Sequence, residues 1–119
     1  MLTRSAKNKG AILQKLVRDY ILASFPLNTW DVKSTTMGER GVDVQLSEKA
    51  REFFNFNIEC KNVERLNLWA SWEQACSRPD APPLLVVKRN KCKPLVVMDA
   101  NDFFNLVRSK RIETSEVMK

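Results

Sequence analysis

The chain has 119 residues, enough for one domain spanning 1–119 and too few for a second core. Its 20 Lys and Arg exceed its 14 Asp and Glu to give a net charge of +6, which suits a polyanionic partner as well as ordinary solubilising charge. The sequence has no histidine, which excludes His-dependent triads, and it has no CxxC pair either, which argues against structural zinc. No apolar run reaches the length of a bilayer, so the sequence predicts neither a membrane span nor a signal peptide.

The first part of the chain is predicted as an amphipathic helix followed by strands. Residues 8–24 carry apolar side chains at spacings of three and four, typical of a helix with one buried face. Pro26 ends this helix, because proline disfavours helical geometry at the residue before it. Residues 29–36 predict a first strand, 37–41 a turn with two glycines, and 42–46 a second strand.

A polar connection over 47–52 leads into a third predicted strand over 53–61. Successive side chains on a strand point to opposite faces. The apolar side chains up to Ile58 therefore occupy one face, and Glu59 and Lys61 emerge together on the other.

A second helix is predicted over 68–77, with a buried apolar stripe. The stripe consists of Leu68, Trp69, Trp72, Ala75 and Cys76. Trp30 is likewise interpreted as a core or interface residue, and Cys60, Cys76 and Cys92 as buried or half-buried free thiols.

Two further strands and a helix complete the chain. Residues 84–88 and 94–98 are continuous apolar runs, as expected for strands covered on both faces. Asp99 is a plausible N-cap for a last helix reaching about Lys110, and the polar tail 111–119 is predicted to fray.

The predicted order is helix, three strands, helix, two strands, helix. Three successive strands followed by helix-linked strands indicate an α/β (α+β) protein with a mixed central sheet flanked by helices.

One acid on the second strand and an acid–x–lysine pair on the third carry the functional argument. If these strands lie side by side, Asp43 falls near Glu59 and Lys61. Two carboxylates and an ammonium in one small volume can hold a hard divalent cation against a phosphate and can control the proton of an attacking water. The alternative is a surface ion pair between Glu59 and Lys61, with Asp43 an acid near a turn.

This pattern resembles the PD-(D/E)XK nuclease superfamily. Asp43 on the second strand, Glu59-x-Lys61 on the third and the element order carry the resemblance over roughly Lys9 to Lys88. The segment 72–75, Trp-Glu-Gln-Ala, looks like that of Holliday junction resolvases within this superfamily. The resemblance implies a restriction-endonuclease-like core of αβββαβ order, here with an extra strand and a C-terminal helix. Gly-Val-Asp stands where many members have Pro-Asp.

The resemblance also implies roles for these residues. Asp43, Glu59 and the backbone carbonyl of Cys60 would bind Mg²⁺, with Mn²⁺ able to substitute, and Lys61 would orient or deprotonate the nucleophilic water. Gln74, on the following helix, would bind the scissile phosphate or hold Lys61, unless it belongs to a plain solvated face. Many resolvase relatives carry a glutamate near the position of Gln14. Gln14 would contact the metal site through water, or it would be a helix-boundary residue without a role in the site.

Further polar residues are candidates for DNA phosphate contacts. They are Lys7, Lys9, Lys33, Ser34, Thr35, Arg40, Ser71 and Arg78. For the residues around the first strand, half-exposed strand positions without function are an equal alternative.

The resulting hypothesis is a metal-dependent endodeoxyribonuclease acting on branched DNA such as Holliday junctions, with a role in DNA recombination. Paired nicking of a four-way junction implies a homodimer. A cytoplasmic location, of a cell or of a phage-infected host, is expected. The alternatives are a nickase or restriction-like nuclease of other DNA preference, a non-catalytic nucleic-acid-binding module, and, more weakly, a basic protein adaptor.

Overall fold

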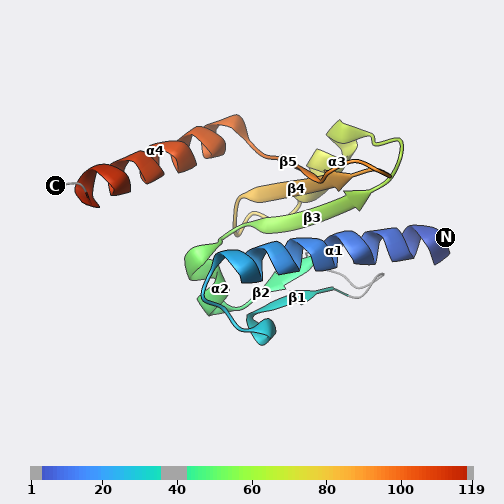
Figure 1. The fold of residues 1–119 in the computed structure, drawn as a ribbon. Coiled ribbons are helices and arrows are strands. Elements are labelled where there is room, and N and C mark those ends of the chain that lie inside the picture. Colours follow the sequence, from blue (N-terminus) through green and yellow to red (C-terminus); the bar gives the residue numbers. More distant parts are fainter. Residues whose placement is uncertain (1–3, 36–42, 118–119) are drawn as a thin grey trace.

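The computed structural model describes residues 4–35 and 43–117, with side chains described as far as residue 110, and its elements follow the predicted order with one added helix. They are α1 (Arg4–Ser24), β1 (Val32–Ser34), β2 (Val44–Leu46), α2 (Glu48–Phe53), β3 (Asn57–Asn62), α3 (Leu68–Ala75), β4 (Pro83–Lys88), β5 (Leu95–Val97) and α4 (Ala100–Val117). The fold is mixed α+β (Figure 1). Within the described ranges no helix combines the length and apolar character needed to cross a membrane.

The strands form a three-stranded mixed sheet and a two-stranded antiparallel one. β3 runs parallel to β4, and β4 is antiparallel to β5, with helices flanking this mixed sheet. β1 pairs with β2 in the second sheet. The two sheets are joined where the Asp43 N–H donates to the Ile58 carbonyl oxygen at 3.1 Å. The second and third strands therefore lie side by side, as expected, although they do not form a continuous ladder.

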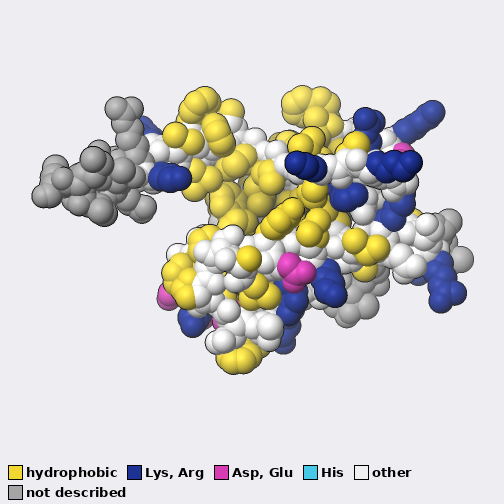
Figure 2. Space-filling view, viewed as in Figure 1, with side chains coloured by type: hydrophobic (Ala, Val, Ile, Leu, Met, Phe, Trp, Pro, Cys, Tyr) yellow, Lys and Arg dark blue, Asp and Glu magenta, His cyan; other side chains and the backbone are white. Residues whose placement is uncertain are grey.

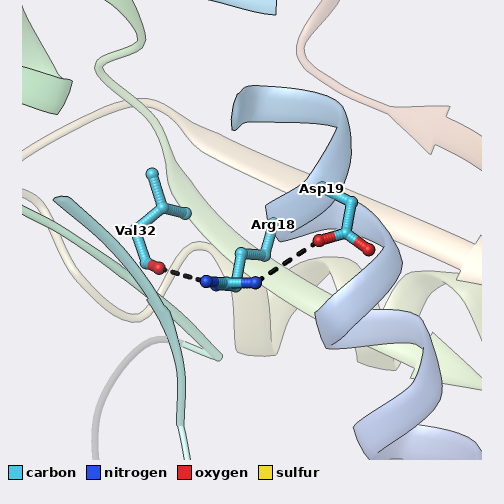
Figure 3. Close-up of polar contacts among 3 residues, drawn as sticks. All are labelled: Arg18, Asp19 and Val32. Carbon is cyan, nitrogen blue, oxygen red and sulfur yellow. Dashed lines mark hydrogen bonds and ion pairs between the residues drawn. The ribbon is translucent and has the colours of Figure 1, made fainter. Parts of the chain in front are cut away.

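α1 covers one face of the strands (Figure 1). Leu13, Val17 and Ile21 are buried on it and belong to the same core cluster as Ile58 and Cys60 of β3. The helix begins at Arg4, four residues before the predicted start. It is also tied to β1, because the Arg18 Nε donates to the Val32 carbonyl oxygen at 3.0 Å while the guanidinium contacts Asp19 at 3.4 Å (Figure 3).

The predicted polar connection over 47–52 is instead the helix α2. Ser47 is its N-cap, and the Ser47 hydroxyl accepts from the Ala50 N–H at 3.1 Å. The same hydroxyl donates to Asp31 at 2.7 Å, which fastens the helix start to the 3₁₀ turn Thr29–Asp31. That turn occupies the beginning of the predicted first strand, so β1 is shorter than expected. The predicted glycine turn at 37–41 lies outside the described residues.

The prediction for the buried face of α3 was right for Ala75 and wrong for the other residues of the predicted stripe. Its buried residues are Ser71 and Ala75, whereas Trp69 is 74% exposed, Leu68 is exposed and Trp72 is half-buried. α3 packs against β3 and β4, and small side chains permit this close approach. The tryptophans consequently lie outside the core, and so does Trp30, which is exposed.

The C-terminal elements are also less covered than the sequence indicated. Leu95 and Val96 of β5 are exposed, so this strand is not covered on both faces. Asp99 caps α4 as predicted, since its carboxylate accepts from the Asp102 N–H at 3.0 Å. The helix continues past Lys110 to Val117, because no glycine or proline interrupts it. Of the free cysteines, Cys60 is buried as expected, whereas Cys76 and Cys92 are exposed.

Candidate active site at the junction of the two sheets

Asp43 lies just before β2, where its backbone bonds both to the residue after β1 and to β3, and its side chain bonds to β3 as well. Its carbonyl oxygen accepts from the Thr35 N–H at 2.8 Å, and its N–H binds Ile58 of β3. Its carboxylate accepts from the Cys60 N–H at 2.6 Å. The hydrogen bond from Cys60 therefore holds the Asp43 carboxylate at the peptide of β3 that links Glu59 to Cys60.

Glu59 and Lys61 emerge together from β3 on the face opposite α1. Alternation sends the neighbouring Ile58 and Cys60 into the core beneath α1. The Lys61 Nζ lies 3.7 Å from the Glu59 Oε1, and the two side chains are 29% and 12% exposed. The structure thus brings Asp43, Glu59 and Lys61 to one place, in the arrangement expected from the strand pattern.

Both carboxyl groups resist ionisation. Burial raises the pKa of Asp43, and the Cys60 N–H and the Lys61 ammonium oppose that rise. Burial, followed by the charge of Asp43, raises the pKa of Glu59 to about 7, against the opposing effect of Lys61. A buried acid and a half-buried acid that repel each other form a site in which an added cation would be stabilised.

The donor set suits a hard cation with a small number of protein ligands. Within the described ranges, no group of three or more His, Cys, Asp or Glu side chains converges as a metal site. The protein oxygens at hand are the two carboxylates and the Cys60 carbonyl, which points to the same strand edge as the Cys60 N–H that binds Asp43. Mg²⁺ commonly keeps several waters and uses few carboxylates, so these residues fit it.

The Cys60 thiol takes no part in this set. It points into the core, and burial, together with Asp43 and Glu59, raises its pKa. The thiol stays protonated near neutral pH and is neither a nucleophile nor a thiolate ligand.

Gln74 reaches the neighbourhood of Glu59 from α3. Gln74, Glu59, Asn57 and Arg78 line one small pocket of about 20 Å³. Gln74 is exposed within α3 and lies beside this pocket. Ser71, predicted to contact a DNA phosphate, is instead buried against the sheet, which contradicts that prediction.

The other predicted DNA contacts are scattered. Lys7 is exposed and Lys9 half-buried near the start of α1, and Lys33 and Ser34 are exposed on β1. The Thr35 side chain is buried, so it is not presented to a duplex. Arg40 lies outside the described residues.

Gln14 is only 3% exposed and belongs to the buried face of α1, so it is not a helix-boundary residue. A water-mediated role for it beside the carboxylates stays a prediction.

Two asparagines that sequence reasoning did not single out hold β3 in place. The Asn57 amide donates to Asp80 at 2.8 Å, and the Asn62 amide donates to the Lys9 carbonyl oxygen at 2.8 Å. Both side chains are buried at the ends of β3. An asparagine at each end of the strand segment Asn57–Asn62 was the signal in the sequence.

Comparison with family models, with curated proteins and with solved structures finds no match to this chain. The site geometry must therefore carry the functional argument.

Proposed function

We propose that the chain is a metal-dependent endodeoxyribonuclease of PD-(D/E)XK type, built on a restriction-endonuclease-like core. The observation that carries this proposal is the 2.6 Å hydrogen bond from the Cys60 N–H to the Asp43 carboxylate. It holds the acid of one sheet against the Glu59–Lys61 pair of the other. A surface ion pair needs no such tie, and it would not leave both acids with raised pKa values.

Each group has a distinct task in phosphodiester hydrolysis. Asp43, Glu59 and the Cys60 carbonyl would hold the cation, which when bound supplies Lewis-acid stabilisation of the charge that builds on the phosphate. Lys61 orients the attacking water and places a positive charge beside the phosphate. Gln74 contacts the phosphate from α3.

The proposed substrate is branched DNA, such as a four-way junction. Lys and Arg gather at the end of the molecule where α1 begins and β4 ends (Figure 2). Basic side chains bind phosphates without reading bases, which favours recognition of DNA shape. Because the three cysteines are free thiols, we also propose a reducing, cytoplasmic location, of a cell or of a phage-infected host.

A cleavage assay tests this proposal. Four-way junction, duplex and single-stranded DNA are incubated with the protein in Mg²⁺, Mn²⁺ or EDTA. Cleavage of the junction in either metal, and none in EDTA, is expected. Equal cleavage of all three substrates would favour a nickase or restriction-like nuclease, and binding without cleavage in either metal would favour a non-catalytic module.

We also propose that the chain forms a homodimer through α4, which would give the two active sites that paired nicking needs. α4 leads away from the sheet (Figure 1), and Phe103, Phe104, Leu106 and Val107 on it are 47 to 68% exposed. Four large apolar side chains exposed on one helix suit such an interface, because homodimer interfaces are more apolar than the rest of a protein surface.

Light scattering after size-exclusion chromatography checks the dimer. The expected mass is twice that of the 13.7-kDa chain. Phe104→Lys should give a monomer, whereas Trp30→Lys, at an exposed position of the 3₁₀ turn Thr29–Asp31, should remain dimeric. A monomeric wild-type protein at micromolar concentration would contradict the dimer.

A further inference from the structure

An open pocket lies on the mixed sheet next to the candidate active site. Lys61 of β3 is in register with Val87 of β4, and Val87 is in register with Leu95 of β5. Residues in register on neighbouring strands point to the same face. Val87 and Leu95 therefore continue, across the sheet, the row in which Lys61 stands, and both line a pocket of about 390 Å³.

The walls of this pocket are apolar. Val87 and Leu95 form one side, and Val63 and Leu66, from the segment that follows β3, form the other. Leu95 is 64% exposed and Val63 is 40% exposed, so the walls are open to solvent. The volume falls within the range of small-molecule sites, and such a space accepts a flat, weakly polar group the size of a nucleobase.

The remaining lining is dominated by positive charge. Lys88, Arg89 and Lys93 line the pocket together with one acid among its described lining residues, Glu64. The Glu64 carboxylate accepts from the Asn90 N–H at 2.8 Å, while the Lys88 Nζ donates to the Arg89 carbonyl oxygen at 3.2 Å and the Arg89 Nε to the Cys92 Sγ at 3.3 Å. Three cations and one acid leave the lining with an excess of positive charge. Apolar walls beside three cations complement a ligand with an apolar face and an anionic group, which is the chemistry of a nucleotide.

Hydrogen bonds hold the two sides of the pocket together before any ligand arrives. The Val63 N–H donates to the Lys88 carbonyl oxygen at 3.0 Å, and the Glu64–Asn90 bond spans the same two segments. Within the turn, the Cys92 N–H donates to the Arg89 carbonyl oxygen at 3.2 Å. A binding site that is already ordered loses less conformational entropy when it captures a ligand.

We infer that this pocket binds one unpaired nucleotide of the DNA substrate, with the base against the apolar walls and the phosphates on Lys88, Arg89 and Lys93. This inference rests on the proposed nuclease function and deepens it. Bases of an intact duplex are stacked and paired, and extracting one costs a few kcal/mol, least where the base is already unpaired. The pocket therefore selects DNA with an unstacked nucleotide near the cut, as at a branch point or a bulge.

Equilibrium binding in EDTA tests this inference without cleavage. The probe is a DNA duplex with a single bulged 2-aminopurine, compared with the same duplex fully paired. Wild-type protein is expected to bind the bulged duplex about tenfold more tightly and to change the 2-aminopurine fluorescence. Leu95→Glu, which places a carboxylate on the pocket wall, should reduce the affinity ratio to about one and abolish the fluorescence change.

Val96→Glu is the matched control. Val96 is the next residue on β5 and is similarly exposed at 57%, but it faces a different pocket beside Val17 and Tyr20 of α1. It adds the same charge, so its affinity ratio should stay at the wild-type value. A wild-type ratio near one, or the same ratio in both variants, would overturn the inference.

The outcome is separable from that of the proposed function. Junction cleavage in Mg²⁺ with a wild-type affinity ratio near one would remove the nucleotide pocket and leave the nuclease. The opposite result is a tenfold affinity ratio that Leu95→Glu abolishes and Val96→Glu does not, with no cleavage in any metal. It would contradict the proposed nuclease activity and support the nucleotide pocket.

Discussion

Replacing Asp43 with asparagine is expected to lower the rate of metal-dependent DNA cleavage by about 1,000-fold, or roughly 4 kcal/mol of transition-state free energy. The substitution removes one of the two charges that would hold the cation. It retains a carbonyl oxygen that still accepts from the Cys60 N–H, so the tie between the two sheets survives. Single-turnover cleavage of a four-way junction measures the rate, and binding in EDTA should remain within about twofold of wild type.

Asp19→Asn provides the matched control for this loss. Asp19 is an exposed acid of α1 whose carboxylate pairs with the neighbouring Arg18, and the same change of charge there should leave cleavage intact. Lys61→Ala should also abolish cleavage while the junction is still bound. Undiminished cleavage by Asp43→Asn would show that the chemistry is not carried by the site between the two sheets.

The elements that sequence predicted well are those whose pattern is local. Alternation along β3 is enough to put Glu59 and Lys61 on one side and Ile58 on the other, because that periodicity is a property of any strand. α2 was missed because residues 47–52 are polar and lack an apolar stripe. The Ser47 cap that starts α2 is also held by Asp31, sixteen residues earlier, and such a contact is not visible in a local pattern.

The parts of the site that sequence could not predict depend on contacts between distant segments. The Asp43 carboxylate meets the peptide of Cys60 seventeen residues later, and Glu64 binds the turn at Asn90 twenty-six residues later. The orientation of α3 follows the same rule. Apolar periodicity favoured a face containing both Trp69 and Ala75, whereas close packing on the sheet buries the smaller side chains of Ala75 and Ser71.

Cleavage is expected to fall roughly 100-fold between about pH 8 and about pH 5 when Mg²⁺ is well below saturation. Burial and then Asp43 raise the pKa of Glu59 to about 7, so the ionised fraction declines about tenfold per pH unit below that value. A protonated Glu59 is a poor ligand for a hard cation. Initial rates across this range measure the effect, and a flat profile at low Mg²⁺ would contradict the role given to Glu59.

The same ionisation acts on stability with the opposite sign. Because the folded pKa of Glu59 lies above its ordinary value of 4.5, the folded chain binds more protons than the unfolded chain between about 4.5 and about 7. The stabilisation is complete below that window and is lost as the pH rises through it; the raised pKa of Asp43 adds in the same direction. Asp31, bound by the Asn28 N–H, and Asp80, bound by Asn57, have lowered pKa values and act oppositely at more acidic pH.

Glu59→Gln separates these contributions in metal-free protein. At about pH 8 it should raise the free energy of unfolding by about 1 to 2 kcal/mol, a gain moderated because water still reaches part of the wild-type carboxylate. At about pH 5 the gain should be small, since wild-type Glu59 is then largely neutral. Urea denaturation in EDTA at both pH values measures the difference, with Glu73→Gln on the exposed side of α3 as control. Equal effects of the two substitutions would mean that the surroundings of Glu59 do not disfavour its negative charge. A gain unique to Glu59→Gln would show that the fold tolerates an unfavourable charge where the cation is proposed to bind.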